Sequence, residues 1–137
     1  MTAKRYLQEI YRLNIKIKQR TEQLDELKAS ASGFRAIDYS ADKIQATPSD
    51  RMANVIGRCV DLEESVNKLV EEYLYKKNYI INQIQGLDDI RYVRILYDHY
   101  VEFKSLDVIS KEIPYDYNWL CHLHGLALKS FADKYLN

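Results

Sequence analysis

Apolar residues recur every three or four positions through the first thirty residues of the chain. This spacing lines them up along one face of an α-helix, and the series has one polar interruption, at Arg20. The pattern therefore predicts a helix over residues 3–30 with a coiled-coil-like seam. The seam consists of Tyr6, Ile10, Leu13, Ile17, Leu24 and Leu27.

A longer series of the same kind predicts a second helix over residues 48–86. Its seam runs through Met52, Val55, Cys59, Leu62, Val66, Leu69, Tyr73, Lys76, Ile80, Ile84 and Leu87. Residues 31–46, between the two series, show no clear periodicity and are predicted to form a connector. Two long helices joined in this way can fold into an antiparallel hairpin, pair with another copy of the chain, or do both. We take residues 1–87 as the first predicted domain.

Shorter apolar series follow from residue 88 onward. They predict helices over residues 88–102, 105–113 and 117–136, with a tight turn at 114–116, and Asp116 is placed to cap the last helix. The residues of that helix expected to face inward are Leu120, Leu123, Ala127, Leu128 and Phe131. This order is typical of a helix-turn-helix. Residues 88–137 are therefore predicted to form a second domain, and the whole fold to be all-α.

Composition limits the classes of protein to consider. The chain has 20 basic and 20 acidic residues, so it lacks the basic excess typical of nucleic-acid-binding proteins. Its two cysteines, Cys59 and Cys121, are far apart in the sequence, which favours free thiols in the reducing cytoplasm. No apolar run approaches the roughly 20 residues that a membrane-spanning helix needs. We expect a cytoplasmic protein without a membrane partner.

Motifs for catalysis or metal binding are not found in the sequence. It has no Gly-rich phosphate loop, nucleophile elbow or HExxH motif, so we expect no enzymatic activity, cofactor or small-molecule substrate. Cys121, His122 and His124 come closest to a metal-binding group. His122 and His124 would lie about 200° apart around a helix, and no second ligand pair occurs at zinc-site spacing. We predict no metal site, and we expect His124 to pack beside the core.

A resemblance to region 4 of bacterial sigma factors covers residues 96–131, which read LYDHYVEFKSLDVISKEIPYDYNWLCHLHGLALKSF. In it LDVISKEI stands for the middle helix, Asp116 for the cap and Leu120 for the apolar anchor. The chain is also similar, through RYLQEIYRLNIKIKQRTEQLDELK and KIQATPSDRMANVIGRCVDLEESVNKLVEEY, to small proteins of phages and prophages of Gram-positive bacteria. These are the ArpU-like phage transcriptional regulators. The resemblance implies a helical hairpin followed by a sigma region 4-like helix-turn-helix.

Candidate DNA contacts lie at the start of the last predicted helix. Tyr117, Asn118, Cys121 and His122 share the face opposite the expected core, and such residues of a recognition helix contact base edges. The flanking candidates are Lys104, Lys111, Tyr115 and Lys129. No Lys or Arg occurs from Glu112 to Leu128, although family members tend to carry basic residues there. Because few positive charges are available to neutralise phosphates, a monomer is expected to bind DNA weakly.

These observations lead to one principal hypothesis and two alternatives. The first is a transcriptional regulator, encoded by a phage, that engages promoter DNA, host RNA polymerase or both, and that forms a homodimer or higher oligomer. The second is a helical protein–protein interaction module whose helix-turn-helix has lost DNA binding. The third is a DNA-packaging protein of the small terminase kind, which also joins a helix-turn-helix to helical oligomerisation.

Overall fold

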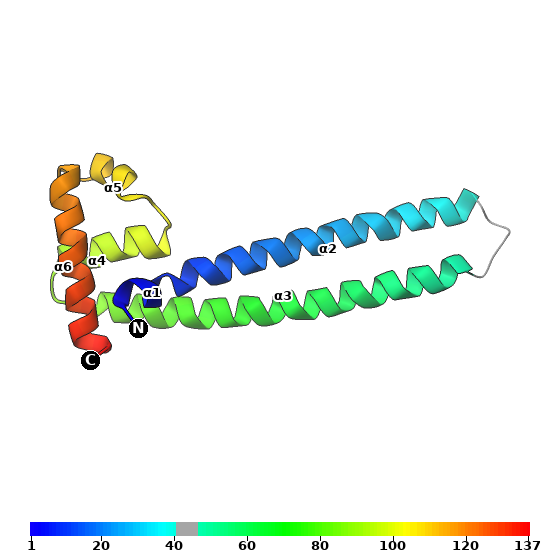
Figure 1. The fold of residues 1–137 in the computed structure, drawn as a ribbon, viewed down its shortest axis with the longest axis horizontal. Coiled ribbons are helices and arrows are strands. Elements are labelled where there is room, and N and C mark those ends of the chain that lie inside the picture. The colour runs from blue at the N-terminus through cyan, green and yellow to red at the C-terminus, as the bar shows by residue number, and fades with distance from the viewer. Residues whose placement is uncertain (41–46) are drawn as a thin grey trace. The chain divides into compact units, whose positions relative to one another are not determined.

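The computed structural model describes the backbone of residues 1–40 and 47–137, and the side chains of residues 1–30 and 50–137. Every regular element within these ranges is a helix (Figure 1), which confirms the all-α prediction. The elements are α1 (Ala3–Leu7), α2 (Glu9–Ser40), α3 (Thr47–Gln85), α4 (Ile90–Leu96), the π-helix η1 (Tyr97–Val101), α5 (Leu106–Glu112) and α6 (Tyr117–Tyr135).

The long helices follow the apolar periodicity, with one correction. Helix α3 lies within one residue of its predicted ends, and α1 and α2 together cover the helix predicted at 3–30. The connector predicted at 31–46 is wrong for residues 31–40, which continue α2. This stretch has no apolar stripe, but it contains one Gly and no Pro, so little in it opposes helix propagation. Residues 41–46 lie outside the described residues.

Two compact units make up the chain. One comprises residues 1–14 and 72–137, and the other comprises residues 15–71. The predicted domain boundary at residue 87 does not coincide with this division. The reason is that Leu7 and Ile10 from the first helices and Ile80 and Ile84 from α3 belong to the same buried cluster as Phe131 of α6.

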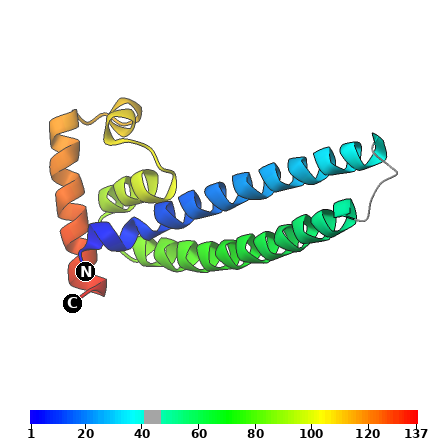
Figure 2. The same cartoon turned by 45° about the vertical axis from the view of Figure 1, so that its right-hand side comes forward.

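In the unit of residues 1–14 and 72–137, α6 packs against α4, α5 and α1 (Figures 1 and 2). The C-terminal half of α6 joins the cluster just described through Ala127 and Phe131. Its N-terminal half belongs to a second buried cluster with α4 and α5, formed by Ile95, Ile109, Ile113, Leu120 and Leu123. Because α6 spans both clusters, its buried face is fixed along most of its length.

The helix predicted at 88–102 is divided between α4 and the π-helix η1. The wider turn is closed by the Glu102 N–H, which donates to the Tyr97 carbonyl at 3.0 Å. Tyr100 and Val101 of this turn are both buried, at 4 % exposure each. The segment ends at Phe103, whose φ of 60° lies in the left-handed region. The sequence pattern predicts a regular helix here because both buried positions fit an apolar face.

In the unit of residues 15–71, segments of α2 and α3 run antiparallel side by side (Figures 1 and 2). Leu24 and Val55 are buried, and Lys28 of α2 forms an ion pair with Glu63 of α3 at 3.3 Å. The other seam positions of this unit are half-buried, namely Ile17, Leu27, Met52, Cys59, Leu62, Val66 and Leu69. In the other unit, Ile10, Leu13 and Ile80 are buried, and Tyr6 and Tyr73 are half-buried.

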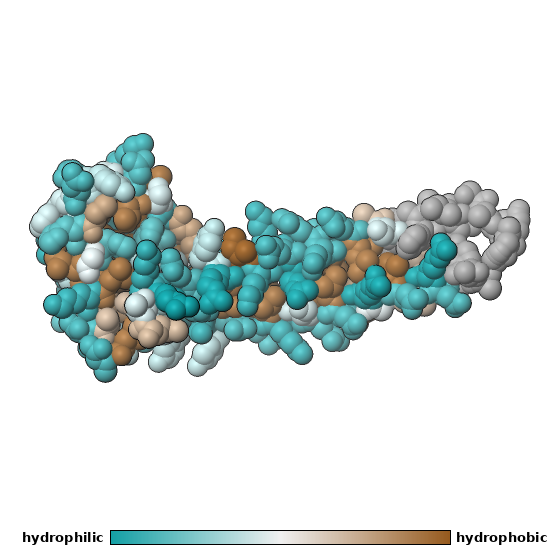
Figure 3. All heavy atoms as spheres, in the orientation of Figure 1, coloured by the Kyte–Doolittle hydropathy of each residue, from teal (hydrophilic) through white to brown (hydrophobic). Residues whose placement is uncertain are grey.

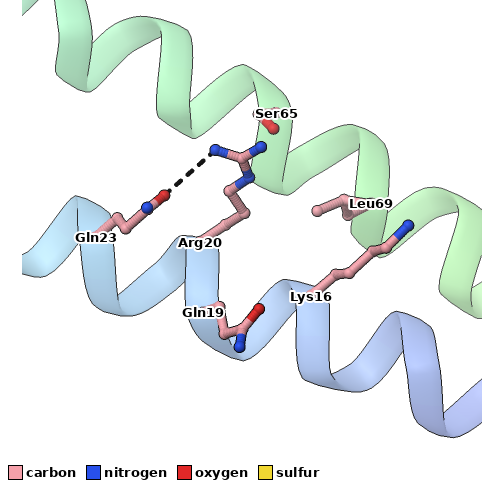
Figure 4. A pocket seen from close by; sticks show the side chains of 6 residues that line it. All are labelled: Lys16, Gln19, Arg20, Gln23, Ser65 and Leu69. Atoms are coloured by element: carbon pink, nitrogen blue, oxygen red, sulfur yellow. Dashed lines mark hydrogen bonds between the residues drawn. The ribbon is translucent and has the colours of Figure 1, made fainter.

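Arg20 interrupts the seam, and a polar groove lies beside it. Figure 4 shows the Arg20 side chain reaching from α2 toward α3 near Ser65, and its Nη1 donates to Gln23 Oε1 at 3.3 Å. The groove has a volume of about 490 Å³ and is lined by Lys16, Gln19, Arg20, Gln23, Ser65 and Leu69. A guanidinium at a seam position cannot replace apolar packing, so the two helices share a polar layer here.

Candidate nucleic-acid interface

The turn before α6 is fixed by a small set of backbone contacts. Ser105 caps α5 by accepting from the Val108 N–H, and α5 ends at Glu112. The Tyr115 N–H then donates to the Ile113 carbonyl at 2.8 Å. Asp116 caps α6 and accepts from the backbone N–H groups of residues 118 and 119, each at 3.3 Å. These contacts place the first turn of α6 directly beside the end of α5.

The outer face of this first turn carries most of the predicted base-reading residues. Asn118 and His122 are exposed, Tyr117 is 48 % exposed, and Cys121 is half-buried. The opposite side of the same turns is buried through Leu120 and Leu123. The structure therefore brings the candidate DNA-contacting residues of α6 together on one accessible face.

The candidate lysines are less available for phosphate binding than these residues are for base contacts. Lys104 Nζ lies 2.9 Å from Glu112 Oε2, and Lys111 Nζ lies 3.4 Å from Asp107 Oδ2. The hydrogen bond to Glu112 raises the pKa of Lys104. Lys129 is exposed and forms no ion pair with any side chain among the described residues. Two of the three candidate lysines would have to give up an internal ion pair before they could bind a phosphate.

Two tyrosines near the turn have different environments. Tyr115 is half-buried and packs against the cluster that holds α5 to α6. Its ring therefore supports the fold of the turn as well as flanking the candidate surface. Tyr117 lies on the outer face, where the neighbouring Cys121 thiol raises the pKa of its hydroxyl.

Sequence reasoning missed an aromatic and apolar part of this surface. Trp119 is 43 % exposed, and its ring centroid lies 5.3 Å from that of His122. Leu126 of α6 and Val108 of α5 are also exposed. The spacing of residues 119, 122 and 126 could have shown that they share a helix face. We call Trp119, His122 and Leu126 the outer stripe of α6.

In the space-filling view, hydrophilic residues cover most of the visible face and apolar patches interrupt them (Figure 3).

A cluster of aromatic rings lies where α6 meets the π-helix. The Tyr100 hydroxyl and His124 Nε2 are 2.8 Å apart, and the ring centroids of His99 and His124 are 5.2 Å apart. Burial, together with the nearby His99 and Lys4, lowers the pKa of His124 to about 4. His124 is half-buried beside the core and does not face outward with His122.

Among the described residues, no group of three or more His, Cys, Asp or Glu side chains is arranged to hold a metal ion. No helix within the same ranges is both long and apolar enough to cross a membrane. Comparison with known proteins found no family model that matches the chain and no solved structure that matches it.

Proposed function

We propose that this chain is a transcriptional regulator that uses the outer face of α6 to contact promoter DNA, with host RNA polymerase supplying part of the affinity. The observation that carries this proposal is the presentation of α6. A short helix and a tight turn lead into it, its inner side is buried, and Tyr117, Asn118 and His122 are accessible on its first two turns. This is how a recognition helix presents its N-terminal residues to the major groove.

The chemistry of the exposed side chains fits base edges better than phosphates. The Asn118 amide can donate and accept at once, as a bidentate contact to adenine requires, and the His122 ring can do either. Residues 88–137 hold six basic and eight acidic residues, so their net charge of −2 opposes DNA. The polymerase is therefore assigned the role of holding the module on the promoter.

Fluorescence anisotropy with labelled phage late promoter fragments tests the DNA contact, with and without polymerase. Each phosphate that the protein neutralises changes the slope of log K against log salt by about −0.9. With two candidate lysines paired internally, we expect a shallow slope of about −1 to −2. No binding at low salt, even in the presence of polymerase, would contradict the DNA part of the proposal.

A matched pair of variants identifies the surface that binds. Asn118→Ala should weaken specific binding by about tenfold, since one bidentate base contact contributes about 1–3 kcal/mol of discrimination. Asn78→Ala changes another exposed asparagine, on α3, and should leave affinity unchanged. Equal affinities of the two variants would place the DNA contact elsewhere than on α6.

The outer stripe favours a second candidate function, protein docking. Exposed Trp is enriched among residues that dominate protein interfaces, and Trp119 lies beside His122 and Leu126 on one face. In this reading α6 binds a polymerase subunit and does not touch DNA. Trp119→Ala should then abolish capture of purified polymerase in the absence of DNA, whereas Asn118→Ala should not. Capture that depends on Asn118 or on added DNA would contradict this reading.

A further inference from the structure

A pocket of about 240 Å³ lies where the π-helix ends, apart from the outer face of α6. Its walls come from two distant stretches of the chain. Gln8 and Tyr11 contribute from the first helices, and His99, Phe103 and Lys104 contribute from the π-helix and the turn after it. The π-helix is a rare element in proteins and is frequently found at functional sites. Here the π-helix positions both the His99 ring and the start of the Phe103 turn.

Phe103 is held in an unfavourable backbone conformation. Its φ of 60° is in the left-handed region, which a bulky residue rarely adopts and which Gly adopts freely. The conformation places its ring against Tyr11, with centroids 5.4 Å apart and planes at 77°. Both rings remain accessible, since Phe103 is 36 % and Tyr11 51 % exposed. A glycine would close the turn without strain, so the aromatic ring is the feature that Phe103 adds.

The hydrogen-bonding groups and the balanced charge of the pocket suit an uncharged ligand. His99 Nδ1 lies 2.7 Å from the Lys104 carbonyl, which can only accept, so in the neutral ring Nε2 is left as an acceptor. The Gln8 side chain makes no hydrogen bond to another described residue. The Lys104 ammonium is neutralised by Glu112 at 2.9 Å. The pocket therefore combines an aromatic pair, free hydrogen-bonding groups and a balanced charge.

We propose that this pocket binds one uncharged aromatic ring that carries an N–H or O–H donor, of the size of phenol or indole. The ring would pack against Tyr11 and Phe103, and its donor would reach Gln8 or His99. A cavity of about 150 Å³ can hold a benzene ring, and ligand sites for larger molecules measure about 300–1,000 Å³. The volume of this pocket lies between the two. This inference goes beyond the proposed transcriptional role and does not depend on it.

Titration of the ¹⁵N-labelled full chain with phenol and with indole tests the proposal by NMR. Saturable shifts should concentrate on the Gln8 side chain and on the amides of residues 99–105. Cyclohexanol, which offers an O–H donor without an aromatic ring, should bind at least about tenfold more weakly. Absence of saturable shifts with both aromatic probes, or equal binding of cyclohexanol, would overturn the proposal.

Phe103→Gly separates binding from folding. The substitution removes the ring and relieves the left-handed strain, so the melting temperature should change little while binding of indole falls at least tenfold. Tyr11→Leu is a second variant on the opposite wall and should also lose binding. Tyr75→Leu, which changes a tyrosine that is 73 % exposed on α3, should bind like the unmodified chain. Unchanged indole binding by folded Phe103→Gly would overturn the assignment of the site.

Two sources can supply such a ring, a free small molecule or the side chain of a Trp or Tyr in a protein. A capped Gly-Trp-Gly peptide distinguishes them. Binding of the peptide with the affinity of indole assigns the pocket to a protein side chain. Binding of indole but not of the peptide assigns the pocket to a free small molecule. Both results support the shared ring chemistry.

Discussion

His124 is half-buried on α6, and its neighbours from other helices offer it no negative charge. Tyr100 and His99 from the π-helix and Lys4 from α1 are the titratable groups that act on it. Burial is the main reason that its pKa falls from 6.5 to about 4. The unfolded chain therefore binds a proton near pH 6.5, whereas the folded chain binds it near pH 4. Between these values the unfolded state holds more protons, so acid favours unfolding.

We expect the contribution of His124 to the melting temperature to be constant above pH 6.5 and to decrease as the pH drops from about 6.5 to about 4. His124→Gln can keep a hydrogen bond to Tyr100 without taking up a proton, so its melting temperature should depend less on pH in that window. Circular dichroism melts from pH 7.5 to 4.5 measure this. His122→Gln changes an exposed histidine and is the control. Identical pH profiles for the native chain and His124→Gln would contradict the expectation.

At the scale of the element, α6 depends on its first turn. Asp116 accepts from two backbone N–H groups that have no partner within the helix. Its negative charge also interacts favourably with the helix dipole at this end. The same turn carries the candidate contact residues. Loss of the Asp116 cap would therefore affect both the stability of α6 and the position of its candidate contact residues.

Asp116→Ala should lower the free energy of unfolding by about 1 kcal/mol, within the range of about 0.5–2 kcal/mol for loss of an N-cap. Asp116→Asn, which keeps a capping oxygen, should lose less. Urea denaturation measures both. Asp25→Ala, at an exposed position of α2, should stay within about 0.5 kcal/mol of the unmodified chain. A loss of the same size in Asp25→Ala would show that the effect is not capping.

Two glycines provide a matched test of helix packing. A Cβ at Gly125, in the middle of α6, would meet nothing within 4 Å, whereas a Cβ at Gly86 would collide with the Tyr135 hydroxyl. Gly125→Ala should therefore raise the free energy of unfolding by up to about 1 kcal/mol through helix propensity. Gly86→Ala should lower it, since the Tyr135 ring, which packs against Phe131, must move. Urea denaturation that shows the opposite order of stability would contradict this packing.

At the scale of the whole molecule, the seam of α1 and α2 meets that of α3 within one chain, in each unit taken by itself. Tyr6 donates to Gln83 at 2.6 Å in one unit, and Lys28 pairs with Glu63 in the other. A seam used within the chain needs no second copy to be covered. The half-buried seam residues leave some apolar area at its edges.

If the seam is used within one chain, the melting temperature should not depend on protein concentration over about a hundredfold range, because unfolding is then unimolecular. Sedimentation velocity should give a mass close to the 16.2 kDa of one chain. A melting temperature that rises with concentration, together with a larger mass, would show that the helices pair between copies. A ring-sized mass would favour the DNA-packaging alternative.

Much of the candidate surface follows from local rules. The capping preference of Asp116 and the spacing of Leu120 and Leu123 are enough to place Asn118 and His122 outside. Neither rule predicts which acidic side chain a lysine pairs with. Lys104 and Glu112 are eight residues apart and meet because a turn and α5 bring them together, so their pairing could not be predicted. Trp119, by contrast, shares a helix face with His122 and Leu126 by its spacing alone, and the structure adds its exposure of 43 %.

The sequence by itself determined most of the helical segments, their seams and the face that α6 turns toward solvent, because apolar spacing and capping act over a few residues. The tertiary structure decided three other features, which depend on contacts between distant segments. It joined residues 1–14 to the C-terminal core, introduced a π-helix at Tyr97–Val101, and placed Tyr11 against Phe103. Local periodicity cannot specify these, because packing selects which helix covers each apolar face and how far the backbone adjusts to fill the core.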